Sequence, residues 1–484
     1  MDLRPIFYVV GALLCILAIS MSVPMFVDMV HNHPDWKVFL LCMSITAFFG
    51  GTTVLTNASD KPFQLTIKQT FLLTAISWFA LAGFGALPFW LASETDIGFT
   101  DAFFESVSGI TTTGATVLTG LDTMPPGILM WRCMLNALGG IGFIVAAMAV
   151  LPFLRVGGMQ LYRTESSDKS DKVLPRMQKV ATAIAYIYFG LIAICALCYW
   201  MAGMSGFDAI THAMSSVATG GFANYDSSFG AFLEHPHILW IAMIFMILGG
   251  LPFVLYIKVL GGNFNALIRN TQVRTFLGLL GGSILISTLW LSMKGVLPFG
   301  EALLQSAFNI VSVVTTTGYA SADYMQWGPF FVVFFFILTF FGGCTGSTSG
   351  GVKIMRYQVM ALILGRHFQK LQQPNAIIAL HYDGRTLPDD VPYSVMVFIF
   401  GFLGAFIVLA LALSMCGLDF ITSISGAATA LTNVGPGLGP VIGPAGNFST
   451  LPDPAKWLIS GGMLLGRLEL FTLLVLVMPS FWRK

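Results

Sequence analysis

Long apolar stretches, separated by short polar segments, make up most of this chain. The stretches at 6–27 and 38–56 are close to the roughly 20 residues that a helix needs to cross a hydrocarbon core about 30 Å thick. The first stretch is longer than the apolar core of a signal peptide, and no cleavage site with small residues follows it. We therefore predict that residues 1–60 form a retained transmembrane hairpin.

From residue 61 onward the pattern repeats as a spanning helix, a short apolar helix, a turn with a glycine, and a second spanning helix. The first spanning helices are predicted at 69–91, 180–202, 275–293 and 393–415, and the second at 129–152, 238–257, 329–357 and 457–480. The pattern predicts ten spanning helices and four half-length ones. The four predicted repeats cover 61–160, 161–262, 263–365 and 366–484.

The four turns share a recognisable sequence. In each turn a glycine follows three residues that are mostly threonine, and successive glycines lie 97 to 117 residues apart. The segments read SGITTTGAT at 108–116, SSVATGGFA at 215–223, SVVTTTGYA at 312–320 and TALTNVGPG at 429–437. One such turn would fit an ordinary helix C-cap. Four copies in register indicate an internal repeat with a shared function.

Composition places the chain in the membrane. Hydrophobic residues make up 56% of the sequence, charged residues make up 10%, and the mean hydropathy is +0.80. A water-soluble domain of this length would not have such a composition. The net charge of +1 gives no reason to expect a nucleic-acid partner.

Basic residues gather in alternate loops, which predicts the orientation in the membrane. They lie in the loops 153–180, 258–274 and 361–392, and the chain ends in Arg483 and Lys484. The loops on the other side are poor in lysine and arginine and contain several acidic residues. We therefore expect both termini to be cytoplasmic and the four turns to face outside.

The turns themselves indicate the chemistry. A helix of about ten residues covers half a bilayer, and irregular backbone at that depth is stable only where it lines a watery cavity. The C-terminal ends of such helices favour a cation, and carbonyl oxygens beyond them can replace its water shell. The predicted ion-binding residues are Thr112, Thr113, Gly114, Thr219, Gly220, Gly221, Thr316, Thr317, Gly318, Asn433, Val434 and Gly435.

These turns, a glycine-rich break in the third repeat and an arginine in the last helix resemble the Trk/Ktr/HKT superfamily of cation transporters. The N-terminal hairpin and the length are most similar to the bacterial TrkH members. The resemblance implies an all-α integral membrane protein, with the hairpin and four pseudo-symmetric repeats around a central cation pore. Members that favour sodium have serine at the first filter glycine, so Gly114 favours potassium.

The resemblance also implies a biological setting. The chain would take up potassium across the bacterial inner membrane as a homodimer in which each protomer has its own pore. A cytosolic nucleotide-binding subunit of the TrkA type would dock on it and regulate it. The resemblance implies no cofactor, and potassium at the filter would be the only bound metal ion.

The glycine-rich break lies at 341–353, where five glycines, two serines and two threonines occur within twelve residues. Each interior glycine costs a helix about 1 kcal/mol relative to alanine, so we predict that the helix breaks here. The resemblance makes this segment a gating loop below the filter, and the alternative is a simple kink. The predicted gating residues are Gly342, Gly343, Gly346, Gly350, Gly351, Lys353 and Arg467.

Arg467 lies near the middle of the last apolar run, where a charge costs about 2.5 to 3.5 kcal/mol. It either faces the ion path or forms a structural salt bridge to another helix. Glu469 is two positions further along and would point elsewhere on a helix, so a direct pair between the two is not expected.

Two other functions stay open. A sodium- or proton-coupled symporter needs intramembrane carboxylates, and Glu105 and Glu469 are the candidates. A membrane enzyme is less well supported, because most of the seven histidines lie in loops. His212 lies in a short helix, and we predict that it is a hydrogen-bonded packing residue.

Overall fold

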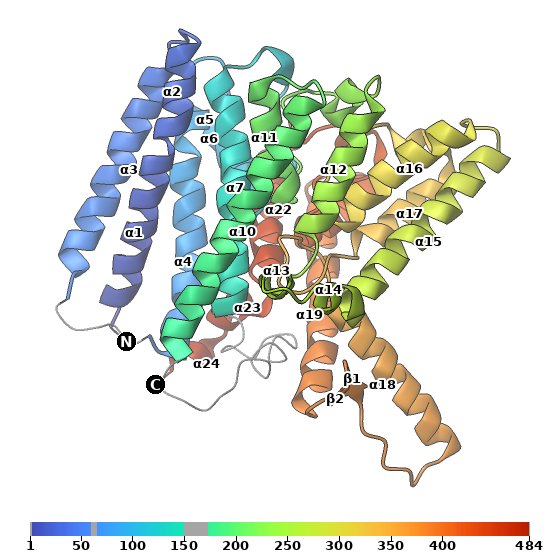
Figure 1. Cartoon of the computed structure of the whole chain (residues 1–484). Helices are drawn as coiled ribbons and strands as arrows, with labels where there is room; N and C mark the ends of the chain where they lie inside the picture. The colour runs from blue at the N-terminus through green and yellow to red at the C-terminus, as the bar shows by residue number, and fades with distance from the viewer. Residues whose placement is uncertain (1, 60–64, 150–172, 484) are drawn as a thin grey trace.

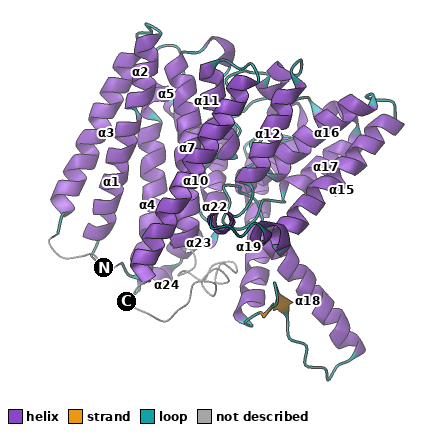
Figure 2. Cartoon of the chain, in the orientation of Figure 1, coloured by secondary structure: helices purple, strands orange, loops and turns teal. Residues whose placement is uncertain are grey.

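Helices form nearly all the regular structure in this computed structural model, which describes residues 2–59, 65–149 and 173–483 (Figure 2). Long helices stand side by side, and the start of α1 lies at the same end of the bundle as α24 (Figure 1). Within the described ranges, seven helices are long and apolar enough to span a membrane, or nine if each of two bent pairs is counted as one span. The chain is therefore a multi-pass membrane protein, as predicted.

The expected N-terminal hairpin is present. It consists of α1 (Arg4–Ser20), α2 (Ser22–Val30) and α3 (Trp36–Asn57). Gly11 and Gly50 allow α1 and α3 to touch, because a Cβ on Gly11 would lie 2.8 Å from the carbonyl oxygen of Gly50. Asp28 joins the hairpin to the rest of the protein, since its carboxyl oxygen accepts a 2.6 Å hydrogen bond from the amide of Gly127.

Four units follow with the same order of elements. Their first long helices are α4 (Ile67–Gly85, extended by α5, Leu87–Leu91), α10 (Val173–Met201), α15 (Thr271–Met293) and α19 (Asp390–Met415). Their short helices, here called the pore helices, are α6 (Phe99–Ile110), α11 (Gly206–Val217), α16 (Phe299–Val314) and α20 (Phe420–Thr432). Their second helices are α7 (Pro126–Ala149), α12 (Pro236–Gly249) with α13 (Phe253–Leu260), α17 (Pro329–Thr339) with α18 (Ile354–Gln372), and α22 (Asp453–Arg467) with α23 (Phe471–Val477).

Short elements complete the chain. They are the 3-10 turns η1 (Leu121–Thr123), η2 (Ser228–Phe232) and η3 (Tyr324–Trp327), the helices α14 (Asn265–Arg269), α21 (Gly439–Ile442) and α24 (Pro479–Trp482), and the antiparallel strands β1 (His381–Tyr382) and β2 (Arg385–Thr386). The strands and α18 project from the end of the bundle where the chain termini lie (Figure 1). The loop predicted at 361–392 is wrong in its first part, because α18 continues to Gln372.

Three of the four second helices are broken, and the continuous spans predicted at 238–257 and 457–480 are wrong. The chain turns by 95° between α12 and α13, where Gly249 and Gly250 are followed by Pro252. It turns by 115° between α22 and α23, where Glu469 and Leu470 have φ of 59° and 49°. Residues 340–353 are not helical, which confirms the predicted break in the third repeat.

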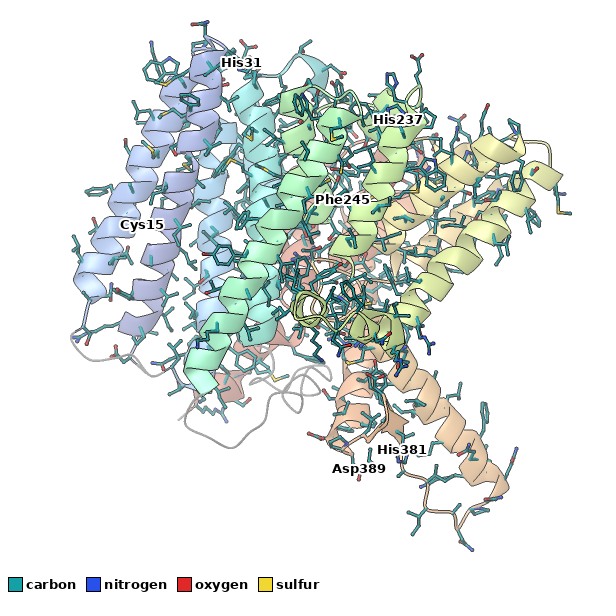
Figure 3. All side chains as sticks on the ribbon, viewed as in Figure 1. Cys15, His31, His237, Phe245, His381 and Asp389 are labelled. Atoms are coloured by element: carbon teal, nitrogen blue, oxygen red, sulfur yellow. The ribbon has the colours of Figure 1, made fainter. Side chains whose placement is uncertain are left out.

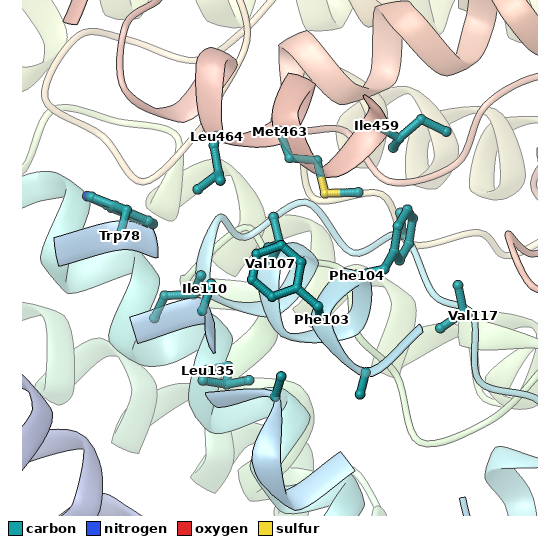
Figure 4. Close-up of a cluster of buried hydrophobic side chains, with 14 of the residues drawn as sticks. Trp78, Phe103, Phe104, Val107, Ile110, Val117, Leu135, Ile459, Met463 and Leu464 are labelled. Carbon is teal, nitrogen blue, oxygen red and sulfur yellow. The ribbon is translucent and has the colours of Figure 1, made fainter. Parts of the chain in front are cut away.

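The first pore helix is buried in an apolar core. Phe103, Phe104, Val107 and Ile110 of α6 pack with Leu135 of α7 and with Ile459, Met463 and Leu464 of α22 (Figure 4).

Side chains project from all sides of the bundle, with His31 and His237 near one end and His381 and Asp389 near the other (Figure 3). Large apolar side chains on α19, such as Phe400, which is 82% exposed, suit contact with lipid. Of the basic residues used to predict the orientation, Arg155, Arg163, Lys169 and Lys172 lie outside the described residues.

Candidate functional site

Each pore helix ends in the same backbone conformation. The residue two positions before each turn glycine is left-handed, with φ of 53° at Thr112, 50° at Thr219, 60° at Thr316 and 55° at Asn433. The four glycines have φ between 81° and 95°. A left-handed conformation strains a threonine, so its recurrence at one position in all four units indicates a requirement of the turn.

A hydrogen bond closes each pore helix at the same place. The amide of the residue before the glycine donates to the carbonyl oxygen five residues earlier, at 2.8 Å in the first three turns and 3.2 Å in the fourth. The donors are Thr113, Gly220, Thr317 and Val434, and the acceptors are Ser108, Ser215, Ser312 and Thr429. Together with the left-handed residue, this bond is the Schellman motif of helix C-termini. Each turn is thus a helix cap, as one copy alone suggested, but it occurs four times.

The four turns meet in a closed ring. A Cβ added to Gly114 would overlap the carbonyl oxygen of Gly220, one on Gly221 would overlap that of Thr317, and one on Gly318 would overlap that of Val434. A Cβ on Gly435 would lie 2.7 Å from the carbonyl oxygen of Thr113, which returns the ring to the first turn. Each glycine therefore packs against the residue that precedes the glycine of the next unit, and there is no room for a side chain.

All twelve residues predicted to bind the ion lie in this ring. Their threonine hydroxyls are buried, and Thr111 and Thr315 form 2.7 Å hydrogen bonds with the hydroxyls of Thr113 and Thr317. Asn433 joins the fourth turn to the first, because its amide nitrogen donates to the hydroxyl of Thr113 over 3.0 Å. Across the described residues, no group of three or more His, Cys, Asp or Glu side chains could hold a metal ion.

The segment 341–353 touches the ends of three pore helices. Thr348 donates its hydroxyl to the carbonyl oxygen of Val217 at 3.1 Å, and Ser349 donates to that of Thr315 at 2.7 Å. The amide of Gly351 donates to the carbonyl oxygen of Thr432 at 2.7 Å. These carbonyls belong to the C-terminal ends of α11, α16 and α20, so the segment covers the partially negative ends of three pore helices.

The predicted gating glycines have little space around them. A Cβ on Gly342 would overlap the carbonyl oxygen of Gly350, and one on Gly350 would overlap that of Thr432. A Cβ on Gly343 would lie 2.8 Å from the carbonyl oxygen of Gly250. Gly346 and Gly351 have φ of 79° and 66°, a region that glycine adopts at low cost.

Two cations are associated with this segment, since Lys353 ends it and Arg467 lies beside it. Arg467 is the last residue of α22, and its Nη1 donates to the carbonyl oxygen of Thr348 at 2.9 Å. Its guanidinium lies 4.1 Å from the ring centre of Phe143, and Lys353 approaches the same ring at 5.2 Å. Lys353 also donates to the carbonyl oxygen of Ser349. Within the described part of the chain, Nε and Nη2 of Arg467 have no hydrogen-bond partner and Arg467 forms no salt bridge.

Both intramembrane carboxylates are paired with arginines that sequence reasoning missed. Glu105 on α6 lies 2.8 Å from Nε of Arg132 on α7, and Glu469 pairs with Arg356 on α18. Glu469 therefore does not pair with Arg467, and the sequence predicted that these two residues would not pair. A basic residue within an apolar run was the available signal for Arg132, because such residues almost always have a partner. Nothing in the sequence distinguished Phe143, whose ring lies against Arg467 and Lys353, from the many other apolar residues.

The chain matches known cation transport proteins over nearly its whole length. The family model TrkH, described as a cation transport protein, matches residues 36–484. The Trk system potassium uptake protein TrkI of Halomonas elongata is 49% identical, and the match covers 99% of this chain and 97% of that protein. The corresponding TrkH of Escherichia coli strain K12 is 37% identical, with 100% of both chains covered.

A solved structure shows the same architecture. The crystal structure of the potassium transporter TrkH from Vibrio parahaemolyticus matches with a TM-score of 0.92 and 33% identity, and the match covers 100% of both chains. Together with the family match and the relatives above, this shows that the chain belongs to the TrkH family of cation transport proteins.

Proposed function

We propose that this protein takes up potassium across a bacterial inner membrane through the ring of four turns. The observation that carries the proposal is the closure of that ring, in which the four glycines and the carbonyls before them pack in chain order. Four pore helices then direct their C-terminal ends toward one centre, where a cation is favoured over an anion. The relatives named above are described as potassium uptake proteins or a potassium transporter.

The twelve ring residues would form the selectivity filter. Their hydroxyl and carbonyl oxygens suit a hard monovalent cation, and glycine stands at all four central positions. The turns are chemically unequal, since Ala218 and Gly220 in the second and Asn433 and Val434 in the fourth replace part of the threonine triplet. The ion would therefore meet four walls of similar backbone and different side chains.

Replacing Gly114 with serine tests the filter. A Cβ there would overlap the carbonyl oxygen of Gly220, so the first two turns must move apart. We expect the preference for potassium over sodium to fall about tenfold, which corresponds to roughly 1.4 kcal/mol. The measurement is rubidium uptake into vesicles with competing sodium.

Gly278→Ser is the matched control, because nothing lies within 4 Å of a Cβ at that position on α15. It should keep the wild-type preference. An unchanged preference in Gly114→Ser would show that the first turn does not select the ion.

Below the filter, we propose that segment 341–353 and Arg467 gate the pathway under the control of a cytosolic nucleotide-binding subunit of the TrkA type. The contacts of this segment with three pore-helix ends and with Arg467 support the gating role. Both chain termini would be cytoplasmic, and two copies of the chain would form a homodimer with one pore each. α18 and the β-hairpin would then project toward the cytosol.

We further propose that flux is not coupled to protons or sodium. A coupling carboxylate must bind and release its ion during transport, whereas Glu105 and Glu469 are buried against Arg132 and Arg356. Rubidium uptake into vesicles at a fixed potential should therefore be the same with and without a pH or sodium gradient. A severalfold stimulation by either gradient would favour the symporter alternative.

A further inference from the structure

Behind the filter ring, a second contact recurs between the pore helices and the turns. We call the four turn glycines, Gly114, Gly221, Gly318 and Gly435, the filter glycines. In three units, the side chain of the residue nine positions before the filter glycine accepts a hydrogen bond from the backbone amide of the residue three positions after that glycine. Glu105 accepts from Val117 at 3.0 Å, His212 accepts from Asn224 at 3.4 Å, and Asn309 accepts from Ser321 at 3.2 Å. Glu105, His212 and Asn309 are fully buried, so water does not replace these bonds. We call this contact the outer brace.

Histidine and asparagine make the brace in the same way. Nδ1 of His212 lies 2.8 Å from the carbonyl oxygen of Asp208, and Nδ2 of Asn309 donates over 2.8 Å to that of Gln305. Each contact reaches back four residues along the pore helix. Because a carbonyl accepts the Nδ1 proton of His212, its Nε2 carries the lone pair that faces the amide of Asn224. The two residues differ in chemistry, yet both offer a donor to the helix and an acceptor to the turn.

In the first unit the brace is charged and extends to the next turn. Glu105 is neutralised by Arg132, whose Nη1 donates to the carbonyl oxygen of Ala223 at 2.7 Å. The guanidinium also lies 4.2 Å from the ring centre of Phe222. Phe222 and Ala223 directly follow the second filter glycine, so this ion pair links the first two turns.

The fourth unit uses a neighbouring residue. Gly426 occupies the equivalent position and has no side chain, and the hydroxyl of Ser425 accepts from the amide of Leu438 at 3.0 Å instead. The bond to this amide is thus present in all four units, although no two of them use the same type of residue.

We infer that the outer brace sets the spacing of the filter and thereby its ion preference. This inference rests on the proposed function. The braced amide lies three residues beyond the filter glycine, so it fixes the outer end of the turn while the Schellman bond fixes the inner end. Because the ring has no free space, a turn that loosens at its outer end moves against its neighbour. Glu105, His212, Asn309 and Ser425 are therefore positioning residues that do not contact the ion.

The experiment exchanges brace residues between the second and third units. Asn309→Leu removes the three side-chain hydrogen bonds of Asn309 and keeps a side chain that branches at the same carbon. Asn309→His installs the residue that the second unit uses. His212→Leu and His212→Asn are the reciprocal pair. Rubidium uptake with competing sodium is measured in vesicles and normalised to the amount of inserted protein.

Both leucine variants should lower the preference for rubidium over sodium about fivefold, the effect of losing the neutral hydrogen bond to the braced amide. Asn309→His and His212→Asn should retain most of the wild-type preference. A merely structural role would lower the amount of inserted protein and leave the preference unchanged, and that result in either leucine variant would overturn the inference.

If the leucine variants fail to insert into the membrane, the exchange variants still test the inference. Loss of preference in inserted Asn309→His and His212→Asn protein would overturn the inference, because both keep the acceptor. Retained preference in both would support it. Wild-type vesicles without rubidium uptake would instead contradict the proposed function, so the two failures are distinguishable.

Discussion

Replacing Arg467 with alanine is expected to raise rubidium uptake roughly thirtyfold per inserted protein. A guanidinium about 8 Å from a passing cation repels it by about 2 kcal/mol at an effective dielectric constant of about 20. The alanine variant also loses the hydrogen bond to the carbonyl oxygen of Thr348, which holds segment 341–353 in place. Both changes act in the same direction.

Arg467→Lys is the control for charge, because it keeps the cation and loses the planar group that lies over Phe143. Its uptake should stay close to the wild-type value. If alanine lowers both uptake and the amount of inserted protein, Arg467 is a structural residue and the barrier hypothesis is wrong.

Deleting residues 347–350 is expected to produce uptake that no longer depends on a cytosolic regulatory subunit. The deletion removes the contacts of Thr348 with Val217 and of Ser349 with Thr315, and it disturbs the bond from Gly351 to Thr432. At about 1 kcal/mol for each hydrogen bond, losing three would shift the balance toward the open pathway about a hundredfold. Uptake is measured in vesicles with and without the regulatory subunit.

A deletion of equal length at 374–377 is the matched control, because this loop follows α18 and is largely exposed. It should leave uptake and its regulation unchanged if that loop has no part in docking. Regulated, wild-type uptake in the 347–350 variant would show that the segment is a kink without a gating role.

The sequence predicted those parts of the fold that repeat in residue type. The threonine-glycine signature identified all four turns, because a left-handed residue followed by a crowded glycine leaves few alternatives. The break at 341–353 was also predictable, since a helix interior does not tolerate five glycines in twelve residues.

The bends and the ion pairs were not predictable in the same way. The run at 238–257 is apolar throughout its bend, and only Arg467 and Glu469 carry charge at the bend of 457–480, so mean hydropathy does not distinguish a broken span from a straight one. Arg132 and Arg356 have partners in other elements of the fold, and only the tertiary fold brings these together. The outer brace was hidden because glutamate, histidine, asparagine and glycine occupy its equivalent positions. The four units share residue types only in the filter turns, whereas the same hydrogen bond to the backbone amide recurs behind the filter in all four.

The closure of the ring by Gly435 against Thr113 also bears on how the protein is made. Gly435 follows Gly318 by 117 residues, which a ribosome translates in roughly 6 to 23 s at about 5 to 20 residues per second. During that interval a nascent chain has three of the four turns of the ring in the membrane and lacks the fourth. The polar inner surface of the first three turns must then be covered by lipid headgroups, by water or by the insertion machinery. A premature stop in the last quarter of the chain would therefore leave an open ring in which Gly318 and Thr113 lack their neighbours from the fourth turn.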